Sequence, residues 1–140
     1  MKYRKLTLVL GTAVALGALT WGGRALWAQQ PGFKRVSLQT QPIAGYAAHE
    51  AVQVRGEFEP GASAPKHTHP GEELGYVMEG TVVFELDGKP PMTVKAGEPF
   101  FIPAGHAHSA KNTGTGVAKV LSTYIVEKGK PLATPVPAKK

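Results

Sequence analysis

The chain has 140 residues, of which 42% are hydrophobic, 17 are glycine and 12 are proline, and its formal net charge is +6. This length supports one domain with a single core, and the many glycines and prolines favour a turn-rich β protein. The charge does not point to nucleic acid, because residues 29–126 hold eight basic and nine acidic side chains and form no basic region.

The first 28 residues have the features of a signal peptide. A basic start, Lys2–Lys5, precedes an apolar run over residues 6–19, and small residues follow up to Ala28. Because a membrane helix needs about 20 apolar residues, we expect cleavage after Ala25 or Ala28, with an uncleaved membrane anchor as the alternative. Either outcome predicts a periplasmic or secreted protein. The chain contains no cysteine, so no disulfide can stabilise it there.

Short strands are predicted in the first half of the remaining chain. Residues 33–38 alternate loosely and predict an edge strand, whereas residues 52–59 alternate between apolar and polar side chains without error. His49 precedes the second strand and has no partner at metal-ligand spacing, so we interpret it as a surface residue. Residues 74–78 and 81–86 predict a hairpin around Glu79-Gly80, where glycine supplies the positive φ of the turn.

The second half continues the β pattern. Strands are predicted at residues 92–96, 99–103 and 117–126, and the last is apolar enough to be buried on both faces. Residues 127–140 consist largely of lysine, proline and alanine, and we expect this tail to be disordered.

Three side chains of metal-ligand type fall within seven residues. His67 and His69 are two residues apart, so both imidazoles leave the same face of an extended chain. Pro70-Gly71 then breaks the strand and allows Glu73 to return to that face. Two imidazoles and a carboxylate suit a divalent first-row metal better than calcium. Glu72 could replace Glu73 if the turn were one residue longer.

A fourth ligand must come from another part of the chain. Residues 103–108 lie about forty residues further on and offer either His106 or His108. The two histidines have the same strand parity, so their position in a strand does not separate them.

At this point the sequence resembles the cupin superfamily. The first motif of that family is matched by Gly61, His67, His69, Glu73 and Gly80, and the second by Gly97, Pro103, Gly105, His108 and Asn112. The resemblance implies an all-β fold, a single-domain antiparallel jelly-roll β-barrel over residues 29–126. It also implies one metal ion held by His67, His69, Glu73 and His108. The family spacing favours Glu73 over Glu72, and it leaves His106 beside the ligands or at the pocket mouth.

A site of this kind predicts metal-dependent chemistry on a small molecule. Four protein ligands leave two positions of an octahedral shell open for water, dioxygen or a bidentate substrate. Non-haem Fe(II) oxygenases need such open positions, so Fe(II) is our first choice and Mn(II) the second, while Ni, Cu, Co and Zn remain compatible. We therefore expect a dioxygenase-type oxidoreductase in which Glu73 is the catalytic base.

Other functions remain open alternatives. Proteins that the sequence resembles include oxalate oxidases, sugar isomerases and sulfonium lyases, so a non-redox lyase or isomerase is one of them. A ligand-binding or metal-sequestering envelope module without turnover is another, and a metal that only stabilises the fold is a third. We expect a homodimer in each case, because a single unit of this fold leaves exposed strand edges and an apolar outer face.

Overall fold

The computed structural model describes residues 30–137, so the predicted signal peptide, residues 1–28, lies outside the described residues. All the regular secondary structure within this range is β-strand. The strands are β1 (Phe33–Pro42), β2 (His49–Phe58), β3 (Ser63–Thr68), β4 (Glu72–Glu79), β5 (Thr81–Leu86), β6 (Met92–Lys95), β7 (Pro99–Ile102), β8 (His108–Asn112), β9 (Ala118–Glu127) and β10 (Thr134–Pro135).

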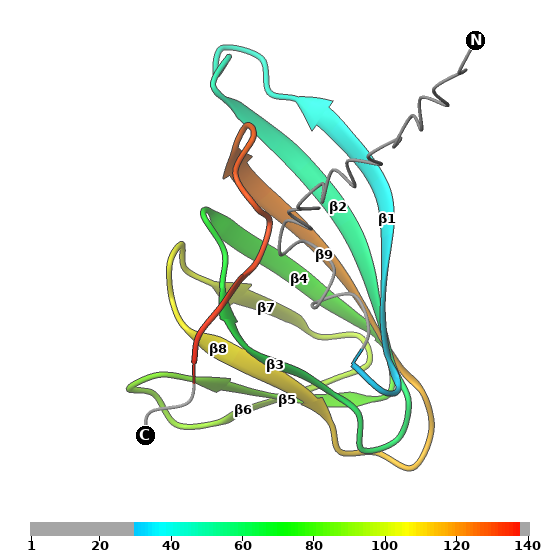
Figure 1. Ribbon diagram of the computed structural model, residues 1–140. Helices are drawn as coiled ribbons and strands as arrows, with labels where there is room; N and C mark the ends of the chain where they lie inside the picture. Colours follow the sequence, from blue (N-terminus) through cyan, green and yellow to red (C-terminus); the bar gives the residue numbers. More distant parts are fainter. Residues whose placement is uncertain (1–29, 138–140) are drawn as a thin grey trace, which may run out of the picture.

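The strands form two antiparallel sheets that face each other (Figure 1). One sheet has the order β1-β2-β9-β4-β7 and the other the order β10-β3-β8-β5-β6. This arrangement confirms the predicted all-β jelly roll. Within residues 30–137 no ladder joins the two sheets, so the predicted barrel takes the form of two facing sheets rather than a closed cylinder. The space between the sheets is where the core and the candidate site lie.

The predicted hairpin around Glu79-Gly80 is wrong. β4 pairs with β7 and β9, whereas β5 pairs with β6 and β8, so the chain crosses from one sheet to the other between them. Gly80 has a φ of 79°, as the predicted turn required, and a Cβ there would lie 2.8 Å from the Cβ of Ala118. Turn residues specify that the chain reverses locally. They do not specify which strand becomes the partner.

The alternation within the strands largely follows the predicted pattern. β2 buries Val54 and Phe58, as its sequence predicts, and His49 is exposed at its first position. β9 differs from the prediction because only one of its faces is fully buried and the other is partly exposed. The outer face of β9 carries polar and apolar side chains in turn, and a sheet face without a covering layer stays in contact with solvent.

The core fills the interior from both sheets. Aromatic rings account for much of it: Phe33 stacks on Phe58 with centroids 4.5 Å apart, and Phe84 packs against Phe100 at 4.2 Å. Stacked aromatic side chains bury large apolar areas and have preferred ring geometries. Buried polar side chains interrupt this apolar interior in one region, and they are His67, His69, Glu73, His108, Asn112 and Ser122.

The C-terminal tail does not fit the prediction of disorder as far as residue 137. Thr134 and Pro135 form β10, which pairs with β3 at Thr68 and His67. The backbone N–H of Val136 also donates to the carbonyl of Lys66 at 3.0 Å. Composition predicted disorder because the segment has few apolar side chains, but backbone hydrogen bonds to a sheet edge do not depend on composition.

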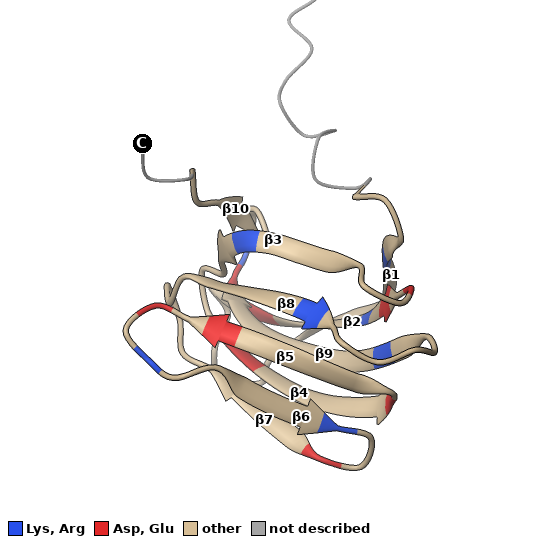
Figure 2. Cartoon of the chain, turned by 90° about the horizontal axis from the view of Figure 1, so that it is seen from below, with Lys and Arg blue, Asp and Glu red and all other residues tan. Residues whose placement is uncertain are grey.

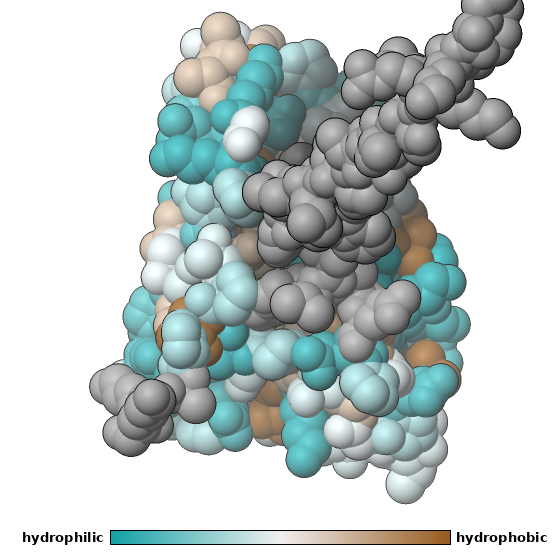
Figure 3. Space-filling model, viewed as in Figure 1, coloured by the Kyte–Doolittle hydropathy of each residue, from teal (hydrophilic) through white to brown (hydrophobic). Residues whose placement is uncertain are grey.

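Charged residues are distributed over strands and turns, and Figure 2 shows lysine and arginine interspersed with aspartate and glutamate. On the face seen in Figure 3, hydrophilic and neutral residues predominate and hydrophobic ones appear as separate spots. In residues 30–137 no helix has the length and apolarity to span a membrane.

Candidate metal centre

The four predicted ligands come from three strands and one loop. His67 lies on β3 and is the register partner of His108 on β8, so the two imidazoles start from adjacent strands of one sheet. His69 follows the end of β3, and Glu73 lies on β4 in the opposite sheet. All four side chains are buried. The site is therefore located between the two sheets, where both contribute to it.

The ligand atoms of these residues lie close together. The Nε2 atoms of His67 and His69 are 3.1 Å apart. The Oε2 atom of Glu73 lies 3.2 Å from Nε2 of His69 and 3.5 Å from Nε2 of His108. The three histidines form one group in which every ligand atom lies within 4.8 Å of the others. The structure thus brings together the four residues that the sequence selected.

Backbone carbonyls orient all three imidazoles in the same way. His67 donates from Nδ1 to the carbonyl of Pro65 at 2.6 Å, and His108 donates from Nδ1 to the carbonyl of His106 at 3.0 Å. His69 donates from Nδ1 to the carbonyl of Leu132 at 2.6 Å. A carbonyl oxygen can only accept, so the proton of each neutral ring is on Nδ1. The Nε2 lone pairs are therefore free to face the centre of the group, as in histidines that bind metals.

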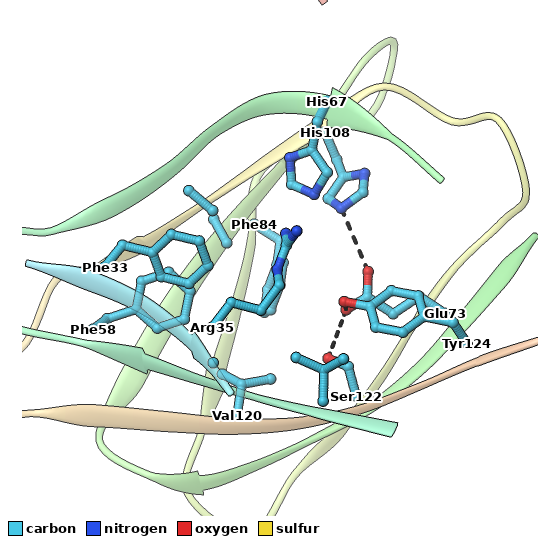
Figure 4. Close-up of a pocket in the computed structure, with 14 residues that line it drawn as sticks. Phe33, Arg35, Phe58, His67, Glu73, Phe84, His108, Val120, Ser122 and Tyr124 are labelled. Atoms are coloured by element: carbon cyan, nitrogen blue, oxygen red, sulfur yellow. Dashed lines mark hydrogen bonds and ion pairs between the residues drawn. The ribbon is translucent and has the colours of Figure 1, made fainter. Parts of the chain in front are cut away.

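The two oxygens of Glu73 have different partners. Oε1 accepts hydrogen bonds from the Ser122 hydroxyl at 2.7 Å and from the Tyr124 hydroxyl at 3.0 Å. Oε2 is buried and has no hydrogen-bond donor among the described residues. Figure 4 shows the carboxylate between Ser122 and His108, with Tyr124 beside it. Oε1 is thus held by β9, while Oε2 is the oxygen that faces the histidines.

The protonation states follow from burial and from these contacts. Burial, with the neighbouring His108 and His69, lowers the pKa of His67 from 6.5 to about 3, so its ring is neutral at pH 7. Burial alone would raise the pKa of Glu73, but its polar surroundings, which include the donating Ser122 hydroxyl, outweigh that effect and hold the pKa below its usual range. Burial and the charge of Glu73 raise the pKa of Tyr124, which keeps its proton and can donate.

This arrangement fits a divalent metal ion. The lone pairs of buried Nε2 atoms and of a carboxylate oxygen point at one another across 3.1 to 3.5 Å, which is repulsive without a cation between them. Neighbouring ligands that are each about 2.1 Å from one ion lie about 3.0 to 3.4 Å apart. The donor set and its spacing therefore match a metal site, and the orphaned Oε2 atom has an explanation.

The turn between β3 and β4 determines which glutamate enters the site. A Cβ on Gly71 would lie 1.7 Å from the carbonyl oxygen of Ile125, so only glycine lets the turn pass this close to β9. Glu73 is then buried beside Ser122, whereas Glu72 is exposed on the other face of β4. The break at Pro70-Gly71 occurs where the sequence predicted it.

His106 contributes through its backbone rather than through its ring. Its carbonyl accepts from His108 Nδ1, and its own Nε2 bonds to the carbonyl of Asp87 at 2.9 Å near the surface. Of the two candidates for the fourth position, His108 therefore lies in the cluster. His106 lies beside that ligand, in the position that the family resemblance implied.

A cavity extends from the ligands into the interior (Figure 4). Its polar part contains His67, His108, Glu73 and Ser122, and its apolar walls are Phe33, Phe58, Phe84, Val54 and Val120. One more charged side chain, that of Arg35 on β1, also lines it. A small molecule in this cavity would contact the ligand cluster and an aromatic wall together.

Sequence reasoning missed several residues of the site. Ser122 and Tyr124 alternate with Val120 and Val126 on the buried face of β9, so two polar side chains in an apolar register were a usable signal. The carbonyl of Leu132 gave no signal, because any residue could supply it. Arg35 interrupts the inward face of β1 and could have been noticed for that reason.

Comparison with protein families identifies one domain. The family described as Cupin domain matches residues 54–124, a stretch that contains His67, His69, Glu73 and His108. The germin-like protein subfamily 2 member 2 of Arabidopsis thaliana is 40% identical over 92 residues, which cover 60% of this chain and 41% of the relative. The oxalate-binding protein of Thermotoga maritima is 37% identical over 73 residues, which cover 51% of this chain and 60% of the relative.

Comparison with solved structures agrees with the family match. An oxalate oxidase in complex with the substrate analogue glycolate superposes with a TM-score of 0.57 and 26% sequence identity, over 71% of this chain and 54% of that chain. The chain thus spans 41% and 60% of the length of the two curated relatives, and 54% of this enzyme chain.

Proposed function

This chain belongs to the cupin family, and from that premise we propose that it is a metal-dependent oxidoreductase of the dioxygenase type that acts on a small organic molecule. The observation that carries the proposal is the convergence of three Nε2 lone pairs and one carboxylate oxygen beside a cavity. Structural metal sites usually surround their ion with four protein ligands and keep no open position or substrate cavity. A cavity next to the cluster supports turnover over a purely structural role.

His67, His69, Glu73 and His108 would hold the ion. When bound, a divalent metal would polarise a substrate oxygen and allow reaction with dioxygen. Fe(II) is the first candidate and Mn(II) the second, because a histidine-carboxylate set with open positions suits both ions. Ni, Cu, Co and Zn are compatible with the same donor atoms, and a metal titration separates them.

Glu73 and its hydrogen-bond partners determine the negative charge of the site and which oxygen could accept a proton. Glu73 stays ionised over the working pH range because its contacts hold its pKa low, and the Ser122 and Tyr124 hydroxyls occupy Oε1. Oε2 faces the histidines and would hold the ion, so Glu73 would have to leave the ion before this atom could accept a substrate proton as the catalytic base. Its low pKa makes Glu73 a weak base and keeps it ionised as a metal ligand.

Oxygen consumption tests the proposal. The protein is reconstituted with Fe(II) or Mn(II) without oxygen, and uptake is then measured with oxalate, other small carboxylates, enediols and phenols. Oxalate is included because one relative is named for binding it and one structural neighbour for oxidising it. We expect metal-dependent uptake with matching loss of one substrate. A fully metal-loaded protein that consumes neither oxygen nor any substrate would contradict the proposal.

A second candidate is a binding module of the cell envelope without turnover. The Thermotoga maritima relative, 37% identical to this chain, is named as a binding protein rather than an enzyme. Calorimetry with the same compounds separates the two functions, because a binding module gives saturable heat and returns the compound unchanged. An enzyme would convert the compound within the same experiment when dioxygen is present.

We also propose export and a homodimer. The sequence of residues 1–28 supports export, and fractionation of cells that express the full chain tests it. The dimer is supported by an exposed apolar surface on β4 and β7 that consists of Leu74, Tyr76, Met78 and Phe101, with Leu74 and Phe101 paired across the strands. Exposed apolar patches often mark contacts between proteins. Light scattering should give twice the chain mass, and Phe101→Ser should shift it toward the monomer.

A further inference from the structure

Arg35 is a charged residue on the inward face of a strand. On β1 it lies two residues after the buried Phe33, and side chains two residues apart leave the same face of a strand. Figure 4 shows its side chain extending into the cavity toward His67 and His108, and it lines that cavity together with Glu73. Polar side chains at inward positions are errors of patterning unless they serve a function.

The guanidinium of Arg35 has no anionic partner within residues 30–137. Its recorded contact is with the ring of Phe33, at 5.7 Å from the ring centroid. Arg55, the arginine of the neighbouring strand, by contrast pairs with Glu57 at 2.7 Å. Arginine keeps its charge at all working pH values and offers five donors. An unpaired guanidinium beside an apolar wall therefore lacks the partner that such a group normally has.

The charge of Arg35 acts on the candidate site. With a divalent ion bound, the cavity would hold two positive charges from the ion, one negative charge from Glu73 and one positive charge from Arg35. Such a cavity attracts an anion, since field lines are focused between low-dielectric walls.

We propose that Arg35 is the anion-recognition residue of this cavity, and that the ligand is a small organic anion with one end at the metal and a second anionic group at Arg35. The inference rests on the proposed function in taking the cavity as the substrate site. A guanidinium binds a carboxylate through two parallel hydrogen bonds, which fixes orientation as well as affinity. The walls of Phe33, Phe58 and Phe84 are apolar, so they favour a short, apolar connecting chain over a polar one.

The position of β1 suggests a different role that the experiment must separate. β1 is an edge strand of its sheet, and inward-pointing charges on edge strands also protect proteins from pairing with other chains. Edge protection depends on the charge of Arg35 but not on the charge of a ligand. Ligands that differ only in charge therefore distinguish recognition from protection.

The test uses calorimetry on the full chain loaded with Mn(II) in the absence of oxygen. The probes are malonate and succinate, their half-amides and their diamides, which carry two, one and no negative charges on nearly the same skeletons. We expect the better-fitting dianion to bind at least about tenfold more tightly than its half-amide. Arg35→Met should weaken that dianion by about 10- to 100-fold and change the half-amide by less than about threefold.

Matched variants keep the interpretation unambiguous. Arg35→Lys should retain part of the preference for the dianion over its half-amide, because lysine keeps the positive charge but lacks the paired donors of the guanidinium. Arg55→Met removes an arginine of the neighbouring strand that pairs with Glu57 outside the cavity, and it should leave all affinities unchanged. All variants should bind one Mn(II) per chain and melt within a few degrees of the parent protein.

Each outcome decides between the inference and the proposed function. Equal affinity for a dianion and its half-amide at both chain lengths, no binding of any probe, or equal losses in Arg35→Met and Arg55→Met would overturn the role of Arg35 while oxygen uptake could still succeed. Charge-dependent binding through Arg35 without oxygen uptake on any substrate would keep the anion site and refute the oxidoreductase.

Discussion

The two oxygens of Glu73 show how single residues prepare the candidate site. The hydroxyls of Ser122 and Tyr124 hold Oε1, and Oε2 lies near Nε2 of His69 and His108 without a donor. A buried carboxylate oxygen without a donor is costly in a metal-free protein. The same atom becomes a strong ligand once a cation is present, so the surroundings of Glu73 favour the metal-bound form.

Replacing Glu73 should remove most of the metal affinity. Glu73→Gln deletes the negative charge of the cluster, and even residues that only support metal ligands change affinity by about 10- to 100-fold. We therefore expect a loss of at least about 100-fold for this ligand itself, measured by metal titration. Glu72→Gln is the matched control, because Glu72 is the exposed neighbour on β4. Equal affinity in both variants would show that Glu73 is not a ligand.

Ser122 should act on the metal through Glu73. Ser122→Ala removes the 2.7 Å hydrogen bond to Oε1 and leaves that oxygen held by Tyr124 alone. We expect metal affinity to fall by about tenfold with little change in the melting temperature of the metal-free protein. Thr123→Ala, a substitution of the next residue on β9 that faces the other way, serves as the control. A loss of stability without any loss of metal affinity would count against this positioning role.

At the scale of elements, the C-terminal segment completes the site. β10 pairs with β3, the strand that carries His67, and the carbonyl of Leu132 orients the ring of His69 through its Nδ1 atom. The Leu132 side chain also packs against Val54, Tyr124 and Val126. A segment whose composition predicted disorder thus fixes the tautomer of one candidate ligand. Removal of this segment should therefore lower the affinity for the metal.

Truncation after Lys130 tests this function of the tail. The shortened protein lacks β10 and the carbonyl that accepts from His69, so we expect metal affinity to fall by about 10- to 100-fold. Removal of residues 138–140 alone should have no effect. Leu132→Ala keeps the backbone carbonyl and should cost stability rather than metal affinity, which separates packing from the hydrogen bond. Unchanged metal affinity after truncation would refute the role of the tail.

Elements also show where prediction from the sequence succeeded and where it failed. The alternation in β2 and the break at Pro70-Gly71 were predictable, because both depend on residues that are close in the chain. The partners of β4 and β5 were not, because the turn at Gly80 can close a hairpin or lead from one sheet to the other. The carbonyl of Leu132 and the pairing of β10 depend on backbone groups that every residue has.

At the scale of the whole molecule, the buried cluster links stability to pH. His67 titrates at 6.5 in an ordinary environment and at about 3 in the folded protein. Below pH 6.5 the unfolded chain binds a proton at this residue and the folded chain does not. The free energy of unfolding of the metal-free protein should therefore fall by roughly 2 kcal/mol between pH 7 and pH 5 from this group.

Urea unfolding of the metal-free protein at the two pH values measures this effect. His67→Gln should flatten the dependence by that amount, whereas His49→Gln, which changes an exposed histidine, should not. The pKa of Glu73 is held below its usual range, so its contribution is retained over this window and is lost only at more acidic pH. An identical pH dependence in His67→Gln and the parent protein would refute the assignment to His67.

We propose that His67, His69, Glu73 and His108 bind one divalent ion through three Nε2 atoms and a carboxylate oxygen. X-ray absorption at the metal edge of the fully loaded protein tests it most directly. We predict one ion per chain with three imidazole nitrogens and at least one carboxylate oxygen within about 2.0 to 2.2 Å. A spectrum with fewer than three imidazoles, or a protein that takes up no stoichiometric metal, would contradict the claim.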